Sequence, residues 1–331
     1  MMPWNTAQKY IDTFLTRTKI DRPSITFMGG EPFLAFQLIS QVVAYVSSEY
    51  SEKNVSYTIV TNGTLVHGAI QEWIKGHEND VHIVLSLDGL GETHNKNRNG
   101  SLHLIDLDFF RSLQKPVLNS VFTPETVGHL SETVIELHEQ GFYVKGFIAD
   151  GEPWSIEHTG IIAEQLMRLI TYYLEHTETC PISLLAQPLH YLTLSEPVRR
   201  CGSETFSEVS VSADGRLWAC HRCSPFENHG TWAIPEKYLE LTNARHLLPE
   251  CETCLLEKIC NACPASNASI KDNQPQAETM CNIRKLLFKA NAYFSLSMLA
   301  SEHDYVALRH LSVEKKKMLA ESSRTILEYL S

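Results

Sequence analysis

Residues 24–32 read Ser-Ile-Thr-Phe-Met-Gly-Gly-Glu-Pro, and this stretch indicates the fold class because a strand, a turn and a helix start follow one another in it. Residues 24–28 form a short β-rich run. Gly29 and Gly30 let the backbone pass close to a ligand, Glu31 offers a carboxylate to a cationic group, and Pro32 suits the first turn of a helix. Taken alone, the stretch is more typical of a strand-to-helix turn with an acidic cap.

The same alternation of strands and helices continues along the first half of the chain. We expect further strands at 56–61, 81–87, 116–122 and 143–149, and helices at 7–16, 35–47, 66–75, 104–113 and 124–140. Strands and helices that alternate at this spacing form right-handed βαβ units, so the sequence predicts an α/β fold with a parallel sheet. The series opens on a helix with no strand ahead of it, as if its first βα unit were cut through.

Polar stretches follow the carboxyl ends of the first three predicted strands, at 29–32, 61–63 and 86–89. This rim carries ligand chemistry in both barrels and open α/β sheets. Ser86 and Asp88, with His94 and Arg98 soon after, offer a hydroxyl, a carboxylate and a guanidinium that suit a carboxylate and ribose hydroxyls. For any one of these residues, a solvated loop with a surface arginine is the commoner explanation.

The composition excludes several classes of protein. The chain has 331 residues, 43% of them hydrophobic, and a formal net charge of −11, so nucleic acid and anionic membranes are poor partners. No apolar run approaches the ~20 residues of a membrane-spanning helix. Polar residues interrupt the first 15 positions, so they are not a signal peptide. We therefore expect a cytoplasmic protein without membrane contact.

The nine cysteines are the compositional anomaly, because none of them precedes Cys180. An odd number crowded into one segment indicates metal ligation in a reducing compartment. The pattern Cys251-x2-Cys254-x5-Cys260-x2-Cys263 brings thiolates close enough to share zinc or an iron–sulfur cluster. One structural zinc uses only four ligands, whereas Cys281 and the pair Cys201 and Cys220 raise the set to seven, which fits two centres better. His221 is a weak candidate for acid–base chemistry.

Taken together, these motifs resemble radical S-adenosylmethionine (SAM) enzymes with a SPASM domain, a family of peptide- and protein-modifying maturases. The resemblance implies a partial TIM-type (β/α) barrel that lacks its first strand, then a cysteine-rich SPASM domain and C-terminal helices. The implied domains are 1–178, 179–285 and 286–331. Independently of the resemblance, the apolar spacing predicts amphipathic helices at 283–300 and 306–330. The implied SAM-binding residues are Gly29, Gly30, Glu31, Pro32, Asn62, Ser86, Asp88 and Arg98.

The resemblance also implies two auxiliary [4Fe–4S] clusters. The first would be bound by Cys201, Cys220 and Cys263, and the second by Cys251, Cys254, Cys260 and Cys281. The family spacing before the last cysteine of the group is x3, whereas x2 separates Cys260 from Cys263 here. This difference affects the assignment of Cys263. Some relatives also have a cysteine a few residues before Cys201, where 195–197 read Ser-Glu-Pro here, so the first cluster is expected to have an open iron or to recruit Cys180 or Cys223.

The largest departure is the absence of the family's C-x3-C-x2-C loop, whose cluster reduces SAM to the 5′-deoxyadenosyl radical. We expect a radical SAM enzyme that abstracts hydrogen from a peptide or protein side chain, with flavodoxin or ferredoxin as electron donor, but inactive without that loop. A truncated gene or a wrong start codon is the expected reason for the absence. The alternatives are a non-catalytic iron–sulfur or peptide-binding remnant and a zinc-stabilised α/β protein.

Overall fold

The structure, a computed structural model, describes residues 1–195, 201, 208–218, 220–223, 246–260, 262–270 and 273–331. The chain falls into two compact units. Unit 1 consists of Met1–Val121, Glu136–Lys145 and Ala213–Arg216, and unit 2 of Phe122–Ile135, Gly146–Ser212 and Leu217–Ser331. The three domains expected from the sequence stay a prediction, and a continuous helix, Gln274–Ala300, runs across the expected boundary at 285.

Five strands form one sheet in the order in which they occur along the chain: β1 (Ser24–Phe27), β2 (Ser56–Thr61), β3 (Val81–Ser86), β4 (Val117–Phe122) and β5 (Tyr143–Ile148). The pairs β1–β2, β2–β3 and β3–β4 are parallel. The predicted α/β fold with a parallel sheet is therefore confirmed, and β1 is an edge strand of this sheet.

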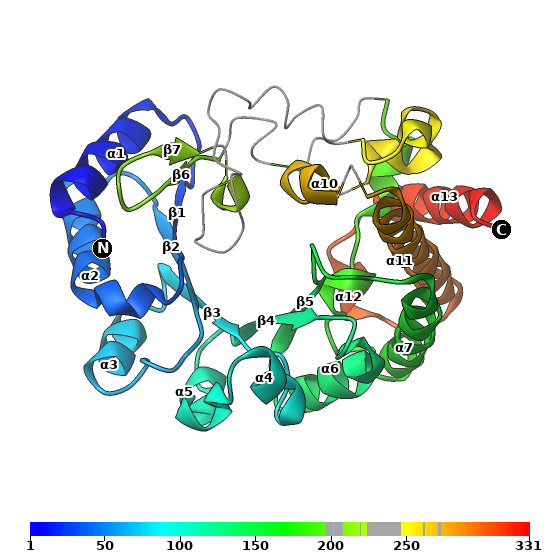
Figure 1. The fold of residues 1–331 in the computed structure, drawn as a ribbon, viewed down its shortest axis with the longest axis horizontal. Coiled ribbons are helices and arrows are strands. Elements are labelled where there is room, and N and C mark those ends of the chain that lie inside the picture. The colour runs from blue at the N-terminus through cyan, green and yellow to red at the C-terminus, as the bar shows by residue number, and fades with distance from the viewer. Residues whose placement is uncertain (196–200, 202–207, 219, 224–245, 261, 271–272) are drawn as a thin grey trace. The chain divides into compact units, whose positions relative to one another are not determined.

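In unit 1, short and medium-length helices connect the strands. They are α1 (Trp4–Arg17), α2 (Phe36–Glu49), α3 (Ala69–Gly76), α4 (Glu92–Asn97), α5 (Leu107–Arg111) and the 3-10 helices η1 (Pro32–Ala35) and η2 (Ser101–Leu104). Figure 1 shows α1, α2 and α3 on one side of β1, β2 and β3. α2 packs there because Ile39, Val42, Val43 and Val46 recur at helical spacing and are all buried.

The two faces of the sheet differ in polarity. Paired residues of parallel strands point to the same face, and Leu85 of β3 is paired with Thr61 of β2 and with Leu118 of β4. All three side chains are buried. The opposite face includes the half-buried Ser86 and Asn119, and the carboxyl ends of the strands hold the first candidate site.

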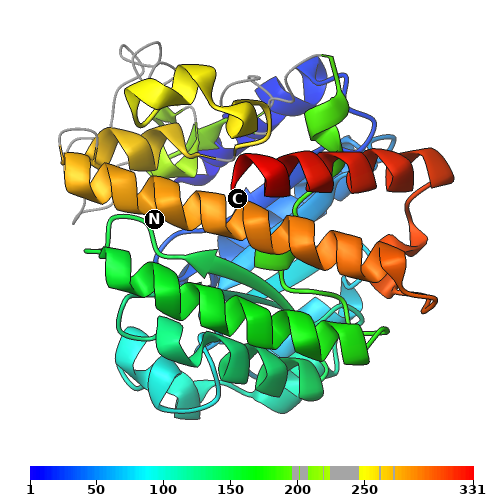
Figure 2. The same ribbon diagram turned by 90° about the vertical axis from the view of Figure 1, so that its right-hand side faces the viewer.

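Unit 2 is mainly helical and contains η3 (Val127–His129), α7 (Ile156–Glu175), η4 (Ser183–Leu185), η5 (Leu189–Thr193), α10 (Pro264–Ile270), α11 (Gln274–Ala300), α12 (Val306–Arg309) and α13 (Val313–Tyr329). α6 (Leu130–Glu139) belongs partly to each unit. Helices α7, α11 and α13 lie side by side (Figure 2) around a core that includes Tyr173, Phe288 and Phe294. A small antiparallel hairpin, β6 (Ser210–Val211) and β7 (Leu217–Trp218), precedes the cysteine-rich part.

Two expectations for the C-terminal helices were wrong. The single helix expected at 306–330 is broken into α12 and α13, because the Ser312 hydroxyl accepts a hydrogen bond from the Lys315 N–H (3.3 Å) and starts a new helix. α11 begins at Gln274 rather than at 283, since Asn273 caps it and a proline occupies its first turn. As a result Cys281 lies on a helix and not in a loop.

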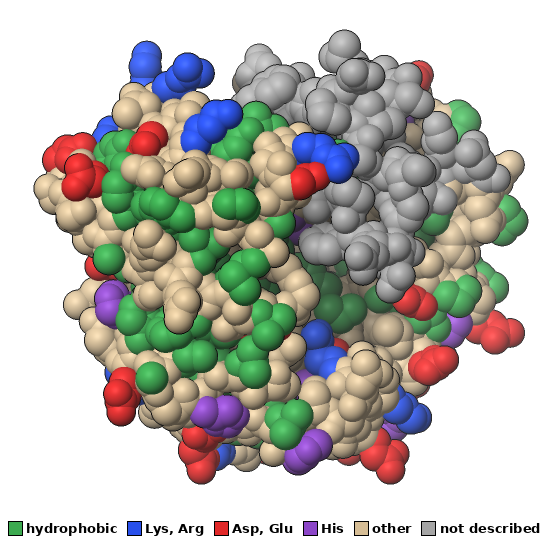
Figure 3. All heavy atoms as spheres, turned by 60° about the vertical axis from the view of Figure 1, so that its left-hand side comes forward, with side chains coloured by type: hydrophobic (Ala, Val, Ile, Leu, Met, Phe, Trp, Pro, Cys, Tyr) green, Lys and Arg blue, Asp and Glu red, His purple; other side chains and the backbone are tan. Residues whose placement is uncertain are grey.

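The described surface agrees with the acidic composition. Lys and Arg side chains stand singly or in small groups on the face in Figure 3 and form no continuous basic area there. Across the part of the chain that the structure describes, we found no helix with the length and apolar composition needed to span a bilayer.

Candidate functional site

The first candidate site lies at the carboxyl ends of the strands of unit 1, where Glu31 joins two loops. Its carboxylate accepts hydrogen bonds from the Phe33 N–H (3.0 Å), the Thr61 hydroxyl (2.9 Å) and the Asn62 N–H (2.8 Å). Glu31 therefore caps η1 and ties the end of β1 to the end of β2, as the simpler interpretation of the sequence predicts. Its role toward a ligand stays a prediction.

The two glycines before Glu31 leave room for a ligand. A Cβ atom added at Gly29 or at Gly30 would meet no atom within 4 Å. The backbone of this turn is thus open to an approaching group, while the next residue, Pro32, is buried at the start of η1. On the neighbouring strand, the Asn62 Oδ1 accepts from the Thr64 N–H (3.0 Å) and closes the turn after β2.

Asp88 and Arg98 form a largely buried ion pair. Arg98 donates from Nε to Asp88 Oδ2 (2.7 Å) and from Nη2 to Oδ1 (3.1 Å), and the carboxylate also accepts from the Val121 N–H (2.8 Å). The Asp88 side chain is 2% exposed and that of Arg98 is 26% exposed. Arg98 is therefore not a solvated surface arginine: it is fixed by Asp88, and none of its recorded bonds to described residues uses Nη1.

His94 positions this pair. Its ring is fully buried, its Nδ1 accepts from the Asp88 N–H (3.3 Å), and its Nε2 lies 3.2 Å from the Ser101 hydroxyl. Burial lowers the pKa of His94, and the nearby Arg98 cation adds to this effect against the opposing influence of Asp88. The ring is consequently neutral at physiological pH, with its proton on Nε2, and it holds the loop after β3.

The sequence reasoning missed Asn119. This residue of β4 is paired in register with Ser86 of β3, so both side chains point to the face opposite Leu85 and Leu118. The Asn119 Oδ1 is buried and has no hydrogen-bond partner among the described residues. A buried unpaired carbonyl is costly unless a ligand supplies a donor. An amide within the strand expected at 116–122 was the available signal in the sequence, but which residue it lies beside depended on the strand register.

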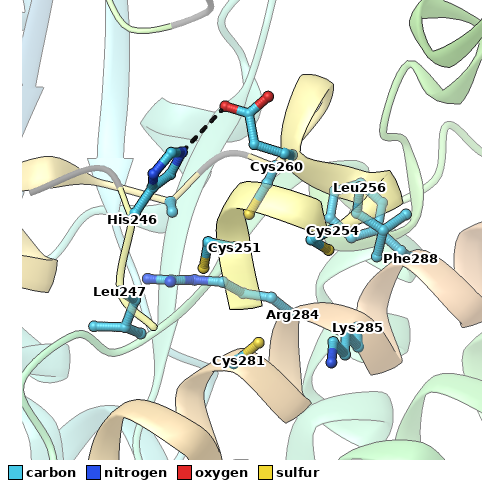
Figure 4. A pocket seen from close by; sticks show the side chains of 12 residues that line it. His246, Leu247, Cys251, Cys254, Leu256, Cys260, Cys281, Arg284, Lys285 and Phe288 are labelled. Atoms are coloured by element: carbon cyan, nitrogen blue, oxygen red, sulfur yellow. Dashed lines mark hydrogen bonds and ion pairs between the residues drawn. The ribbon is translucent and has the colours of Figure 1, made fainter. Parts of the chain in front are cut away.

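The second candidate site is a pocket in unit 2 lined by four cysteines (Figure 4). Cys251 belongs to the 3-10 helix η7 (Pro249–Thr253), Cys254 and Cys260 flank η8 (Leu255–Lys258), and Cys281 comes from α11. All four side chains are partly exposed. Residues far apart in sequence thus bring four sulfur atoms to one cavity.

The environment of these thiols suits metal-coupled deprotonation. Burial raises the pKa of Cys260, while Arg284 acts in the opposite direction. Burial also raises the pKa of Cys281, and Lys285 opposes that shift. The thiols of Cys260 and Cys281 therefore keep their protons at neutral pH, and a bound metal would displace these protons because thiolate is the ligating form.

The four thiols of the pocket are a donor set that suits zinc or an iron–sulfur cluster. Among the described residues, no three His, Cys, Asp or Glu side chains converge closely enough to hold one metal ion. An iron–sulfur cubane places each thiolate on a different iron and keeps the sulfurs further apart. The four-cysteine set is therefore compatible with a [4Fe–4S] cluster.

The remaining cysteines lie elsewhere in unit 2. Cys220 and Cys263 both pack against Trp218 and Ala265, outside the four-cysteine pocket. Cys201 is half-buried and Cys180 is exposed, and the side chain of Cys223 falls outside the described residues. The structure brings Cys220 and Cys263 to one small cluster, and the ligand set of a first auxiliary cluster stays a prediction. The other candidate there, His221, lies 3.7 Å from Glu208, and both are partly exposed.

Comparison with known proteins adds three sequence matches, of which the family match lies in unit 1. A family described as a 4Fe-4S single cluster domain matches residues 2–103, a segment without cysteine, so the match rests on the scaffold. An uncharacterized protein of Methanocaldococcus jannaschii is 42% identical over 89 residues, 27% of this chain and 30% of the relative. The radical SAM cyclopropyl synthase TigE of Paramaledivibacter caminithermalis is 27% identical over 118 residues, 34% of this chain and 24% of TigE. The chain thus matches less than a third of these relatives' length.

Solved structures agree on the fold over nearly the whole chain. Polyhistidine-tagged anSMEcpe with bound AdoMet superimposes with a TM-score of 0.70 at 18% identity, covering 97% of this chain and 90% of that one. Native anSMEcpe with bound AdoMet and the Cp18Cys peptide gives a TM-score of 0.68 at 17% identity, with 91% and 92% covered. At this identity the likeness concerns the fold alone. By sequence, the chain is similar to a 4Fe-4S single cluster family and to a radical SAM enzyme, each over about a third of its length.

The two candidate sites lie in different units of the chain. The matched segment 2–103 contains Glu31, Ser86 and the Asp88–Arg98 pair, so the rim of unit 1 is the shared architecture that the comparisons detect. The four-cysteine pocket lies outside that segment, and its four thiols suit the binding of an iron–sulfur cluster.

Proposed function

We propose that this chain binds SAM at the rim of unit 1, holds iron–sulfur clusters on the cysteines of unit 2, and belongs to a system that modifies a peptide side chain. The observation that carries the proposal is the convergence of four cysteines on one pocket in a chain of this fold. The peptide is inferred from anSMEcpe, whose structures include bound peptides. A flavodoxin or ferredoxin is the proposed electron donor.

Each polar group of SAM has a counterpart in unit 1. The open backbone at Gly29 and Gly30, beside Glu31, suits the amino group. Arg98, oriented by Asp88, and the hydroxyl of Ser86 suit the carboxylate. These assignments are the ones that the sequence implies. The structure adds that Asp88 holds the Arg98 side chain in a fixed direction.

Asn119 completes the proposed SAM site as an acceptor for a ribose hydroxyl. We expect Asn119→Leu to weaken SAM binding about tenfold while leaving the free energy of unfolding unchanged or slightly higher, since it removes an unpaired buried carbonyl. Equilibrium dialysis with labelled SAM and chemical denaturation measure the two effects. Thr58→Val is the matched control, a polar-to-apolar change on the same face nearer the start of β2. Unchanged SAM affinity in Asn119→Leu would contradict the assignment.

Cleavage of SAM is not assigned to these residues alone. The printed sequence has no cysteine before Cys180, so it does not supply the three thiolates that hold the SAM-reducing cluster in this family. When bound, the clusters supply electron transfer, and the protein supplies binding and orientation. The competing functions are a non-catalytic iron–sulfur or peptide-binding protein and a zinc-stabilised one.

Metal analysis separates the cluster proposal from the zinc alternative. After anaerobic reconstitution we expect about four iron atoms and equal sulfide for the four-cysteine pocket, and about eight if a second cluster is present. Cys254→Ser should remove about four iron atoms because it deletes one of four ligands. Cys180→Ser is the control, as this thiol is exposed and outside the pocket. One zinc per chain without iron would refute the proposal.

A further inference from the structure

Helix α11 presents more than a cysteine to the pocket. Cys281, Arg284, Lys285 and Phe288 follow at the spacing that places residues on one helix face, and all four line the cavity. In the view of Figure 4, the Arg284 side chain lies between Cys251 and Cys281, with Lys285 beside it on the helix. Two cations therefore face four thiols.

These cations have no carboxylate partner among the described residues. Arg284 donates from Nη2 to the Asn267 Oδ1 (2.9 Å), and Asn267 is itself buried, so a neutral group fixes the guanidinium. Lys285 makes no recorded ion pair with a described residue. The one carboxylate that lines the pocket, Glu257, lies 3.5 Å from His246. The positive charge of the helix face is thus left to act on the sulfurs.

The C-terminal helix contributes a third group. The Tyr329 side chain, near the end of α13, interacts with Cys254. The Lys289 ammonium donates to the Leu330 carbonyl (3.0 Å) and ties the end of α13 to α11. A phenol hydroxyl therefore lies beside one of the four sulfurs.

We propose that Arg284, Lys285 and Tyr329 raise the reduction potential of the cluster bound by the four-cysteine pocket. The proposal rests on the proposed function, which places the cluster there. Four thiolates give such a cluster a negative charge that grows by one on reduction, so nearby cations and hydrogen-bond donors favour the reduced form. A cluster bound in this pocket would therefore be suited to accept an electron and would not only stabilise the fold.

The test is an anaerobic redox titration of the iron-loaded full chain, followed by visible absorbance. The redox transition that is missing in Cys254→Ser is assigned to the cluster of the four-cysteine pocket. Lys285→Gln and Arg284→Gln are each expected to lower the ratio of reduced to oxidised cluster about tenfold at a fixed potential, a shift of about 59 mV for one electron. Tyr329→Phe should shift it in the same direction by less. Lys317→Gln, an equal charge change at an exposed position of α13, should leave it unchanged.

Several outcomes would overturn the proposal. One is an unchanged ratio in both glutamine variants with full iron content. Another is loss of iron in Lys285→Gln, which would show that this cation is needed to keep the cluster bound and not to set its reduction potential. Arg284→Lys keeps the charge and should keep the wild-type ratio, so it separates charge from the bond to Asn267 if Arg284→Gln folds poorly. Failure of the proposed function is recognised separately, as a wild-type chain without iron.

Discussion

Asp88→Ala is expected to lower the free energy of unfolding by about 3 kcal/mol, the lower end of the ~3–5 kcal/mol range for removing one partner of a buried ion pair. The substitution leaves the Arg98 guanidinium and the Val121 N–H without their acceptor. The lower end applies because the Arg98 side chain is 26% exposed, so water can solvate the guanidinium when Asp88 is removed. Chemical denaturation monitored by circular dichroism measures the loss.

A surface pair provides the control for Asp88. Glu164 and Arg168 of α7 are each 62% exposed, so Glu164→Ala should cost less than about 0.5 kcal/mol. Asp88→Asn keeps an acceptor for the Val121 N–H and should lie between the two. A loss below about 1 kcal/mol in Asp88→Ala would show that the buried pair does not hold the loop.

Gly63→Ala should be comparably damaging, with an expected loss of about 2–5 kcal/mol. The residue has φ +82°, a conformation that costs a side chain about 1–2 kcal/mol. Its Cβ would also lie 2.7 Å from Leu85 Cδ1 and 3.1 Å from Ile105 Cγ2. Overpacking of a filled core adds about 1–3 kcal/mol. The loss is measured as a shift in the denaturation midpoint at constant slope.

Gly100 separates strain from overlap. It has φ +71°, but an added Cβ there would meet nothing within 4 Å. Gly100→Ala should therefore lose only the backbone contribution of about 1–2 kcal/mol. Equal losses at the two glycines would contradict the expected overlap between an added Cβ and the core at the turn after β2, where Thr61 also bonds Glu31.

Local patterns accounted for most elements of the fold. The strand expected at 56–61 has the same bounds in the structure, and the helix expected at 35–47 begins one position later. These elements follow from side-chain periodicity and turn residues over short windows. The break between α12 and α13 was missed because apolar spacing continues across it, while the cap at Ser312 decides where a helix starts.

For the candidate sites, too, the local sequence and the tertiary structure determined different features. The sequence by itself determined the chemistry on offer: a Gly-Gly-Glu turn, a Ser-x-Asp loop with an arginine, and cysteines in spaced pairs, because residue type and spacing are local properties. Only the tertiary structure decided that Arg98 is turned toward Asp88, that Asn119 stands beside Ser86, and that Cys281 meets Cys251, Cys254 and Cys260 with two cations at its side. Strand register and helix packing bring together residues distant in sequence, and burial then sets how strongly their charges interact.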